Sequence, residues 1–404
     1  GRCAYLAQRR RAEYAPVVVA PKAALFSEAD DLEGYDIVIA DEELDSHLIG
    51  WFELDRDRLD AWIRGMDEHP EAYPEGCAER TLVRALALII QSITYTRPID
   101  GNQRLHPQCV RIRDHIEPVA RHLGLTLDEF RDLIGRLYEA PAPRGGRMPF
   151  ESPWEQKTKL LRGQIPIRAF RDLVELLVAE LDYSGRTDSR LWLLLDYPAR
   201  AAGLPDGAPL PASIVAVTPR HRIIDILTGR RTIILDATPD RDVLDWVFPG
   251  RVTYHRFRTQ ESTRVVQLTD SVHCNPQSLP AVRRRVAQLA NGVPARITRK
   301  QLVAEGGEGA LVGWWGRDDQ AHNHWECAPA LVLENHYSIP PYRARMLVEA
   351  LRYDRPPAEA PRRYDRYEGT DREGLRAGAT DETDADVARY TANYWGRRVI
   401  QAIG

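Results

Sequence analysis

The sequence predicts an α/β protein interrupted by a long helical segment. Short apolar runs typical of buried parallel strands occur near its start, at 17–20 and 35–40. From about 56 to 194, apolar residues recur at spacings of three and four, which predicts amphipathic helices. Strand-like runs then return and alternate with helix-like segments. We therefore expect α/β structure on both sides of a helical insertion.

The individual elements follow from the same periodicities. The helices predicted in the middle region cover 79–93, 111–123, 127–137 and 167–181. The strands predicted after it cover 213–217, 232–235, 251–254, 263–268, 295–298, 310–314 and 330–333. Helices are expected between these strands at 280–290 and 341–352, and a last helix at 387–403, after a polar loop over 355–386.

Composition excludes several classes of protein. With 404 residues, 43% of them hydrophobic and 28% charged, the chain is able to bury a sizeable core. A net charge of -4 gives no general attraction to nucleic acid, so such a surface would have to be a local patch. The five scattered cysteines argue against a disulfide framework, and no apolar run is long enough for a membrane span. We expect a cytoplasmic protein without membrane contact.

Both ends look like internal positions of a longer chain. The sequence begins at Gly1 without a methionine and stops at Gly404 inside an apparently helical run. We therefore treat it as a fragment.

An apolar strand that ends in adjacent acids is the strongest local signal. Ile37-Val-Ile-Ala precedes Asp41 and Glu42, as in a Walker B strand. Such a strand would hold Asp41 at the edge of the sheet, where it can bind the Mg²⁺ of a nucleotide, while Glu42 polarises the attacking water. Strands that end in ordinary surface acids are the alternative.

Further segments follow in a characteristic order. They are Asp236-Ala237-Thr238 after a second apolar strand, Thr298-Arg299-Lys300, Val312 to Gly316, His322 to Trp325, and Gln401-Ala-Ile-Gly404. Together with the acid strand, their order and spacing resemble the superfamily-2 helicases, especially the DEAH-like branch that carries a large helical insertion. The resemblance covers most of 14–54 and 212–404.

The resemblance implies two RecA-like domains. The first, incomplete at its start, would comprise 1–54 and 212–245, with the helical insertion at 55–211. The second, incomplete at its end, would comprise 246–404. ATP with Mg²⁺ would bind between the two domains and single-stranded DNA would cross both. The family's range includes plasmid and phage replication, so replication proteins are further expected partners.

Site residues are carried over motif by motif. Asp41 would hold Mg²⁺, Glu42 would activate water, and Thr238 would sense the nucleotide state. Gln401 and Gly404 would face the nucleotide. The residues expected along the DNA, by backbone contact or by stacking on bases, are Thr298, Lys300, Trp315, Asn323 and Trp325.

The sequence departs from the family pattern in four places, one of which is the acidic stretch Arg317-Asp-Asp-Gln-Ala in the expected cleft motif. Glu43-Leu44 stands where the DEAH box has Ala-His, so the coupling role of that histidine is unassigned. None of the four lysines follows a glycine, so the chain has no Gly-Lys-Ser/Thr phosphate loop. The arginine finger expected after Gly404 is absent, although Arg397 and Arg398 lie one turn before Gln401. We expect the phosphate loop upstream of Gly1, and no ATP hydrolysis by the fragment itself.

Metal-binding patterns are sparse. Cys3-Ala-Tyr5 resembles the last ligand segment of the iron–sulfur branch of these helicases, whose other cysteines would lie upstream; an isolated cysteine is the alternative. A zinc site would have to combine ligands from two separate segments, without any CxxC pair: His273, Cys274, His322, His324 and Cys327.

Two other function classes remain open. Residues 119–130 predict a helix, a turn at Gly124 and a second helix, the pattern of a helix-turn-helix DNA reader and equally of any helical hairpin. A non-hydrolysing DNA-binding or replication-initiation protein on a degenerate ATPase scaffold would use this segment. A nuclease-coupled or terminase-like ATPase would need carboxylates clustered for two metals, whereas the acids of 364–386 predict a solvated loop.

Overall fold

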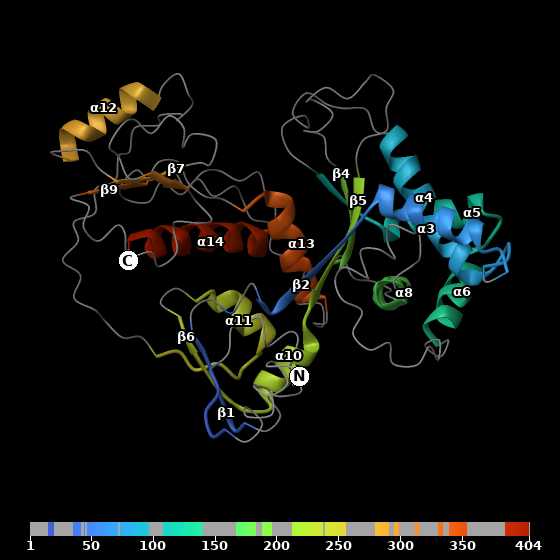
Figure 1. The fold of residues 1–404 in the computed structure, drawn as a ribbon, viewed down its shortest axis with the longest axis horizontal. Helices are drawn as coiled ribbons and strands as arrows, with labels where there is room; N and C mark the ends of the chain where they lie inside the picture. Colours follow the sequence, from blue (N-terminus) through green and yellow to red (C-terminus); the bar gives the residue numbers. More distant parts are fainter. Residues whose placement is uncertain are drawn as a thin grey trace, which may run out of the picture. The chain divides into compact units, whose positions relative to one another are not determined.

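The chain folds into two compact units. Unit 1 comprises Gly1–Leu48, Arg220–Ala344 and Ala358–Gly404, and unit 2 comprises Ile49–Pro219 and Arg345–Pro357 (Figure 1). The structure, a computed structural model, describes residues 15–19, 35–41, 44, 47–71, 73–96, 108–139, 167–182, 188–195, 212–236, 239–255, 279–290, 295–298, 312–314, 330–333, 339–353 and 384–403.

Unit 1 contains two parallel sheets among its described residues. Strand β1 (Ile37–Asp41) pairs in parallel with β6 (Arg231–Leu235), and Asp41 lies opposite Leu235. In the second sheet, β7 (Ala295–Thr298) lies between β8 (Val312–Trp314) and β9 (Leu331–Leu333). Parallel pairing requires a crossover connection, and the one between β1 and β6 includes most of unit 2.

Among the described residues, helices cover one face of the β1–β6 sheet. Its helices include α10 (His221–Thr228) and α11 (Arg241–Val247), which contribute Ile223, Leu227 and Leu244 to a core with Ala40, Leu44, Leu48 and Phe248. Because side chains alternate along a strand, Ile37, Ile39, Ile233 and Leu235 lie on the other face, and all four are exposed. We expected a fully buried strand here, and that prediction is wrong for this face.

The remaining described helices of unit 1 are α12 (Leu279–Ala290) and α14 (Ala385–Ile403). Helix α13 (Pro341–Arg352) begins in unit 1, and its residues from Arg345 onward belong to unit 2.

Unit 2 is built on an antiparallel sheet of four strands in the order β2-β5-β4-β3. The strands are β2 (Ile49–Asp55), β5 (Ala212–Pro219), β4 (Leu191–Leu195) and β3 (Gln108–Arg111). Its helices are α3 (Arg56–Glu68), α4 (Ala78–Thr96), α5 (Arg113–His122), α6 (Leu127–Glu139) and α8 (Ile167–Leu181). The helices and one face of the sheet share a large apolar core that includes Trp62, Leu86, Phe130 and Leu193.

Local signals explain where these helices begin and turn. The Asp55 carboxylate accepts a hydrogen bond from the Arg58 N–H at 2.8 Å and so caps α3. Between α5 and α6, Gly124 adopts a φ of 76°, which a glycine tolerates without strain. Thr126 and Glu129 then form a reciprocal capping box at the start of α6.

The mixed α/β class is confirmed, as are the four helices predicted in the middle region and the strand at 295–298. The insertion is not purely helical, because β3 and β4 lie within 55–211, and the strand expected at 213–217 in the first domain belongs to the same antiparallel sheet. A run of five apolar residues such as β4 has no periodicity that separates a strand from a buried helix. The insertion was predicted to cover 55–211. The observed unit 2 covers 49–219 and also includes 345–357.

Two predicted strands are wrong and one lies outside the described residues. Residues 17–19 are exposed and form no strand, and neither do 251–255. The valines of 17–19 have β-propensity, but propensity without a packed partner does not make a strand. The strand expected at 263–268 falls outside the described part of the chain. No described helix is both long enough and apolar enough to cross a membrane.

Candidate functional site

The carboxyl ends of β1 and β6 place two acids at one edge of the sheet. Asp41 ends β1 opposite Leu235, and Asp236 follows Leu235 directly. Asp41 is exposed and Asp236 is half-buried. The carboxyl edge of parallel strands is where nucleotides bind in α/β proteins. The pairing therefore brings the end of the acid strand and Asp236 to the same edge of the sheet.

Helix α11 begins five residues after Asp236 and is capped by Asp240. One oxygen of its carboxylate, Oδ1, accepts a hydrogen bond from the Val243 N–H at 3.2 Å. The side chain of Asp240 is completely buried. Burial raises the pKa of this carboxyl, and the positive charge of Arg397 opposes that shift.

Helix α14 is attached to this end of α11 by three side chains at spacings of four. Arg397 Nη2 lies 3.1 Å from Oδ2 of Asp240, the oxygen that does not cap the helix. One turn earlier, Asn393 donates to Asp242 at 3.1 Å. Two turns earlier, Arg389 Nε donates to the same carboxylate at 2.6 Å. Residues four apart lie on neighbouring turns of one helix face, which is why one stripe of α14 meets two acids of α11.

Two predicted site residues besides Asp41 can be located or partly located, Gln401 and Thr298. Gln401 lies in the backbone of α14, one turn after Arg397. Thr298 ends β7 and is fully buried, and its hydroxyl has no hydrogen-bond partner among the described residues. A direct contact of Thr298 with DNA would require exposure that this arrangement does not provide. Asp236, unlike Thr238, is described.

The other predicted site residues lie outside the described part of the chain. They are Glu42, Thr238, Lys300, Trp315, Asn323, Trp325, Gly404 and Cys3. The same holds for all five residues of the possible zinc site.

The sheet edge fits a nucleotide-bound Mg²⁺ better than a metal caged by protein. Asp41 offers one exposed carboxylate, and Mg²⁺ commonly binds through one or two carboxylates together with substrate phosphates. Within the described ranges, no three His, Cys, Asp or Glu side chains are grouped closely enough to hold a metal.

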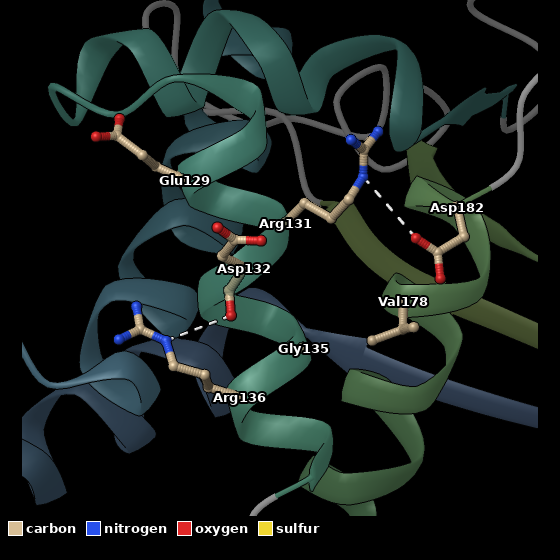
Figure 2. A pocket seen from close by; sticks show the side chains of 7 residues that line it. All are labelled: Glu129, Arg131, Asp132, Gly135, Arg136, Val178 and Asp182. Carbon is tan, nitrogen blue, oxygen red and sulfur yellow. Dashed lines mark hydrogen bonds and ion pairs between the residues drawn. The ribbon is translucent and has the colours of Figure 1, made fainter.

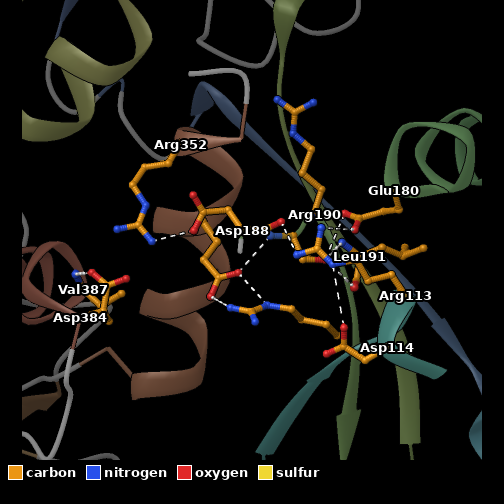
Figure 3. Close-up of polar contacts among 12 residues, drawn as sticks. Arg113, Asp114, Glu180, Asp188, Arg190, Leu191, Arg352, Asp384 and Val387 are labelled. Carbon is orange, nitrogen blue, oxygen red and sulfur yellow. Dashed lines mark hydrogen bonds and ion pairs between the residues drawn. The ribbon is translucent and has the colours of Figure 1, made fainter. Parts of the chain in front are cut away.

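Unit 2 contains a separate cluster of buried charges (Figure 3). Glu349 on α13 accepts two hydrogen bonds from Arg111, at 2.8 and 3.2 Å, and one from the Ser189 N–H at 3.0 Å. Burial raises the pKa of Glu349 to about 7, although Arg111 opposes the shift. Arg352, one turn further along α13, pairs with Asp188 at 2.7 Å.

The second carboxylate of this cluster has the same character. Glu180 accepts hydrogen bonds from the Ser189 hydroxyl at 3.0 Å and from the Arg190 N–H at 2.6 Å. Burial also raises the pKa of Glu180. Both glutamates are almost fully buried and held by neighbouring donors, so they fasten α8, β4 and α13 together and have no access to a substrate.

The predicted helix-turn-helix segment forms a helical hairpin, α5–Gly124–α6. A depression of about 580 Å³ lies beside α6 and α8 and includes Glu129, Asp132 and Asp182 in its lining (Figure 2). Arg131 of the same lining pairs with Asp182 at 3.8 Å. The first turns of α6, which would enter a DNA groove, expose Asp128, Glu129 and Asp132. Three exposed acids would repel phosphates, so this hairpin is poorly suited to reading DNA.

Sequence reasoning overlooked Asp240 and the role of Arg397. The available signal was the four-residue spacing of Arg389, Asn393 and Arg397 ahead of Gln401, which predicts a polar stripe on one helix face. The partner of that stripe is not encoded locally.

Comparison with known proteins adds no assignment: no protein-family model matches the chain, and no curated protein matches it at a significant level.

Proposed function

We propose that this chain belongs to an ATP-dependent DNA helicase or translocase, in which ATP hydrolysis drives movement along single-stranded DNA. It would comprise two RecA-like domains, the first interrupted by unit 2. The parallel pairing of β1 with β6 is the observation that carries the proposal. Residues 42–230 separate the two strands, yet Asp41 and Asp236 end at one edge. That edge is where a nucleotide site requires them.

The proposed roles follow from this placement. Asp41 would bind the Mg²⁺ of ATP, and that ion would neutralise charge on the phosphates. Glu42, the next residue, would orient and polarise the attacking water. Thr238, two residues after Asp236, would respond to the nucleotide state, and Gln401 on α14 would face the nucleotide. Lys300, Asn323 and the tryptophans Trp315 and Trp325 would contact the DNA strand.

The alternative of a non-hydrolysing DNA-binding protein gains less support. It depended on the segment 119–130 as a DNA reader, and α6 exposes Asp128 and Glu129 within that segment and Asp132 just beyond it.

The test is ATP hydrolysis by the product of the complete gene, with and without single-stranded DNA. Glu42→Gln keeps the size of the side chain and removes its basicity. We expect it to lower DNA-stimulated kcat by about 10²- to 10⁴-fold, with nucleotide binding retained. Glu43→Gln is the matched control, since the adjacent acid has no assigned role, and it should hydrolyse ATP nearly as well as wild type.

Two outcomes would count against the proposal. A folded wild-type protein that binds DNA and hydrolyses no ATP would leave a DNA-binding scaffold as the better account. Equal losses in the Glu42 and Glu43 variants would show that Glu42 is not the specific base.

A further inference from the structure

The contact between α11 and α14 links two segments that the proposed function uses separately. We call the five residues Asp240, Asp242, Arg389, Asn393 and Arg397 the α11–α14 clasp. Asp240 is two residues beyond Thr238, and Arg397 is four residues, about one helical turn, before Gln401. The clasp therefore joins the helix that follows the Thr238 segment to the helix that carries Gln401.

The inner part of the clasp is the buried ion pair between Asp240 and Arg397. The side chain of Asp240 has no exposure and that of Arg397 has 12%, so both charges are largely removed from water. The two oxygens of Asp240 have different tasks, because Oδ1 caps α11 and Oδ2 faces Arg397. Removing one member of such a buried pair leaves an uncompensated buried charge, so a substitution at either residue should weaken the contact between α11 and α14.

The outer part is more accessible. Asp242 is 25% exposed and Arg389 50% exposed, and Arg389 also pairs with Asp386 on its own helix at 2.9 Å. Exposed pairs contribute little free energy. Asn393 shares the Asp242 carboxylate, so this part of the clasp fixes the rotation of α14 as well as its position.

We propose that the α11–α14 clasp positions Gln401 relative to the segment that carries Thr238, so that the two act on one nucleotide as a unit. This inference rests on the proposed function. Asp240 and Arg397 are positioning residues, because they act through Thr238 and Gln401. A displacement of about 1 Å in a catalytic group is enough to lower a rate by about 100-fold. Because the buried pair is close in sequence to both segments, its loss should shift them enough to lower the rate.

The test compares the same substitution at two helix caps in the full-length protein. Asp240→Asn retains an oxygen to cap α11 and removes the anionic partner of Arg397. Asp55→Asn is the matched control, because Asp55 also caps a helix, α3, and also pairs with an arginine, Arg58, at 3.6 Å. Arg397→Gln removes the other member of the buried pair.

We expect Asp240→Asn and Arg397→Gln each to lower DNA-stimulated kcat by about 10- to 100-fold, with the KM for ATP changed less than about threefold. The double variant should be no worse than the poorer single variant, because both changes remove one interaction. Amide hydrogen exchange over 384–403 should rise in both variants, and Asp55→Asn should match wild type in every measurement. Asp242→Asn, at the partly exposed contact, should give a smaller loss of kcat in a protein of unchanged thermal stability.

The outcomes separate this inference from the proposed function. If wild type hydrolyses ATP and the clasp variants do so equally well, the inference is overturned and the motor stands. If the losses of Asp240→Asn and Arg397→Gln add in full, the two residues do not act through one contact, and the inference again fails. If wild type does not hydrolyse ATP, both proposals fall.

Discussion

The β1–β6 sheet of unit 1 and the four-stranded sheet of unit 2 differ in how they are covered. In unit 2 the strand β4 has four of its five residues buried, and its neighbours lie on both sides of it. In unit 1 the face of β1 and β6 that carries Ile39 and Leu235 is exposed. The better-covered sheet supplies a large apolar core, whereas the less covered one presents Asp41 and Asp236 at its edge. Stability and candidate chemistry are thus concentrated in different units.

The carboxylates of the two units also differ in how deeply they are buried. In unit 2, Glu180 and Glu349 are buried acceptors that hold neighbouring elements together. In unit 1, Asp41 is exposed at the end of its strand, and among the described carboxylates of this unit only that of the clasp residue Asp240 is comparably buried. A buried carboxylate with its donors in place serves the fold, and an exposed one at a sheet edge remains available to a ligand.

The largest effect should be the difference in stability between two leucine-to-alanine variants, one in each sheet. Leu193→Ala on β4 removes a side chain with 0% exposure, and we expect a loss of about 2–5 kcal/mol in the free energy of unfolding. Leu235→Ala on β6 alters a side chain that is 53% exposed, and the loss should stay below about 1 kcal/mol. Urea unfolding, with hydrogen exchange to locate each change, measures both. Equal losses would show that the exposed face of β6 is covered in solution, and the contrast between the sheets would disappear.

A pH titration of stability should reveal the buried carboxylate of unit 2. The pKa of Glu349 is about 7 in the folded protein, against an ordinary value of 4.5, so the folded state holds a proton that the unfolded chain releases. The contribution of this residue to stability is therefore fully present below pH 4.5 and is lost as the pH rises toward 7. Relative to Glu349→Gln, wild type should lose about 1–3 kcal/mol of unfolding free energy across that window.

An exposed acid of the same unit provides the opposite sign. The backbone N–H of Thr126 lowers the pKa of Glu129, so its contribution is present above the ordinary pKa and is lost as the pH falls. Glu129→Gln should therefore leave unchanged the slope of unfolding free energy against pH between pH 4.5 and 7. For the Glu349 prediction, the contradicting outcome is that the unfolding free energies of wild type and Glu349→Gln change in parallel between pH 4.5 and 7. That result would mean that Arg111 keeps Glu349 ionised throughout this range.

The smallest effect concerns two thiols of unit 2. Burial raises the pKa of Cys109 to about 11, and it raises the pKa of the less buried Cys77 as well. Only the thiolate reacts with maleimide, so Cys109 should be labelled at least about tenfold more slowly than Cys77 at pH 8. The measurement uses a chain in which Cys3, Cys274 and Cys327 are replaced by serine. Rapid labelling of Cys109 in the folded chain would show that β3, at the edge of its sheet, opens readily.

Local patterns predicted much of the secondary structure. Helix α8 and strand β7 have the bounds that their periodicity indicated, and α4 and α6 agree to within a few residues. The strands of unit 2 were harder to predict, because β3 and β4 are short and lack alternation between apolar and polar residues. Of the candidate site, Asp41 and the segment after β6 were predicted from strands that end in polar residues, and the structure brings their ends together.

By itself, the sequence determined most of the long helices, which apolar runs precede polar residues, and in what order the helicase-like segments follow one another. Tertiary structure alone decided that β5 joins the sheet of unit 2, that β1 pairs with β6, and that Asp240 meets Arg397. Helical periodicity depends on neighbours three and four residues away, which the sequence displays directly. Strand pairing and buried ion pairs join residues far apart in the chain, and their partners are selected only when the whole core closes.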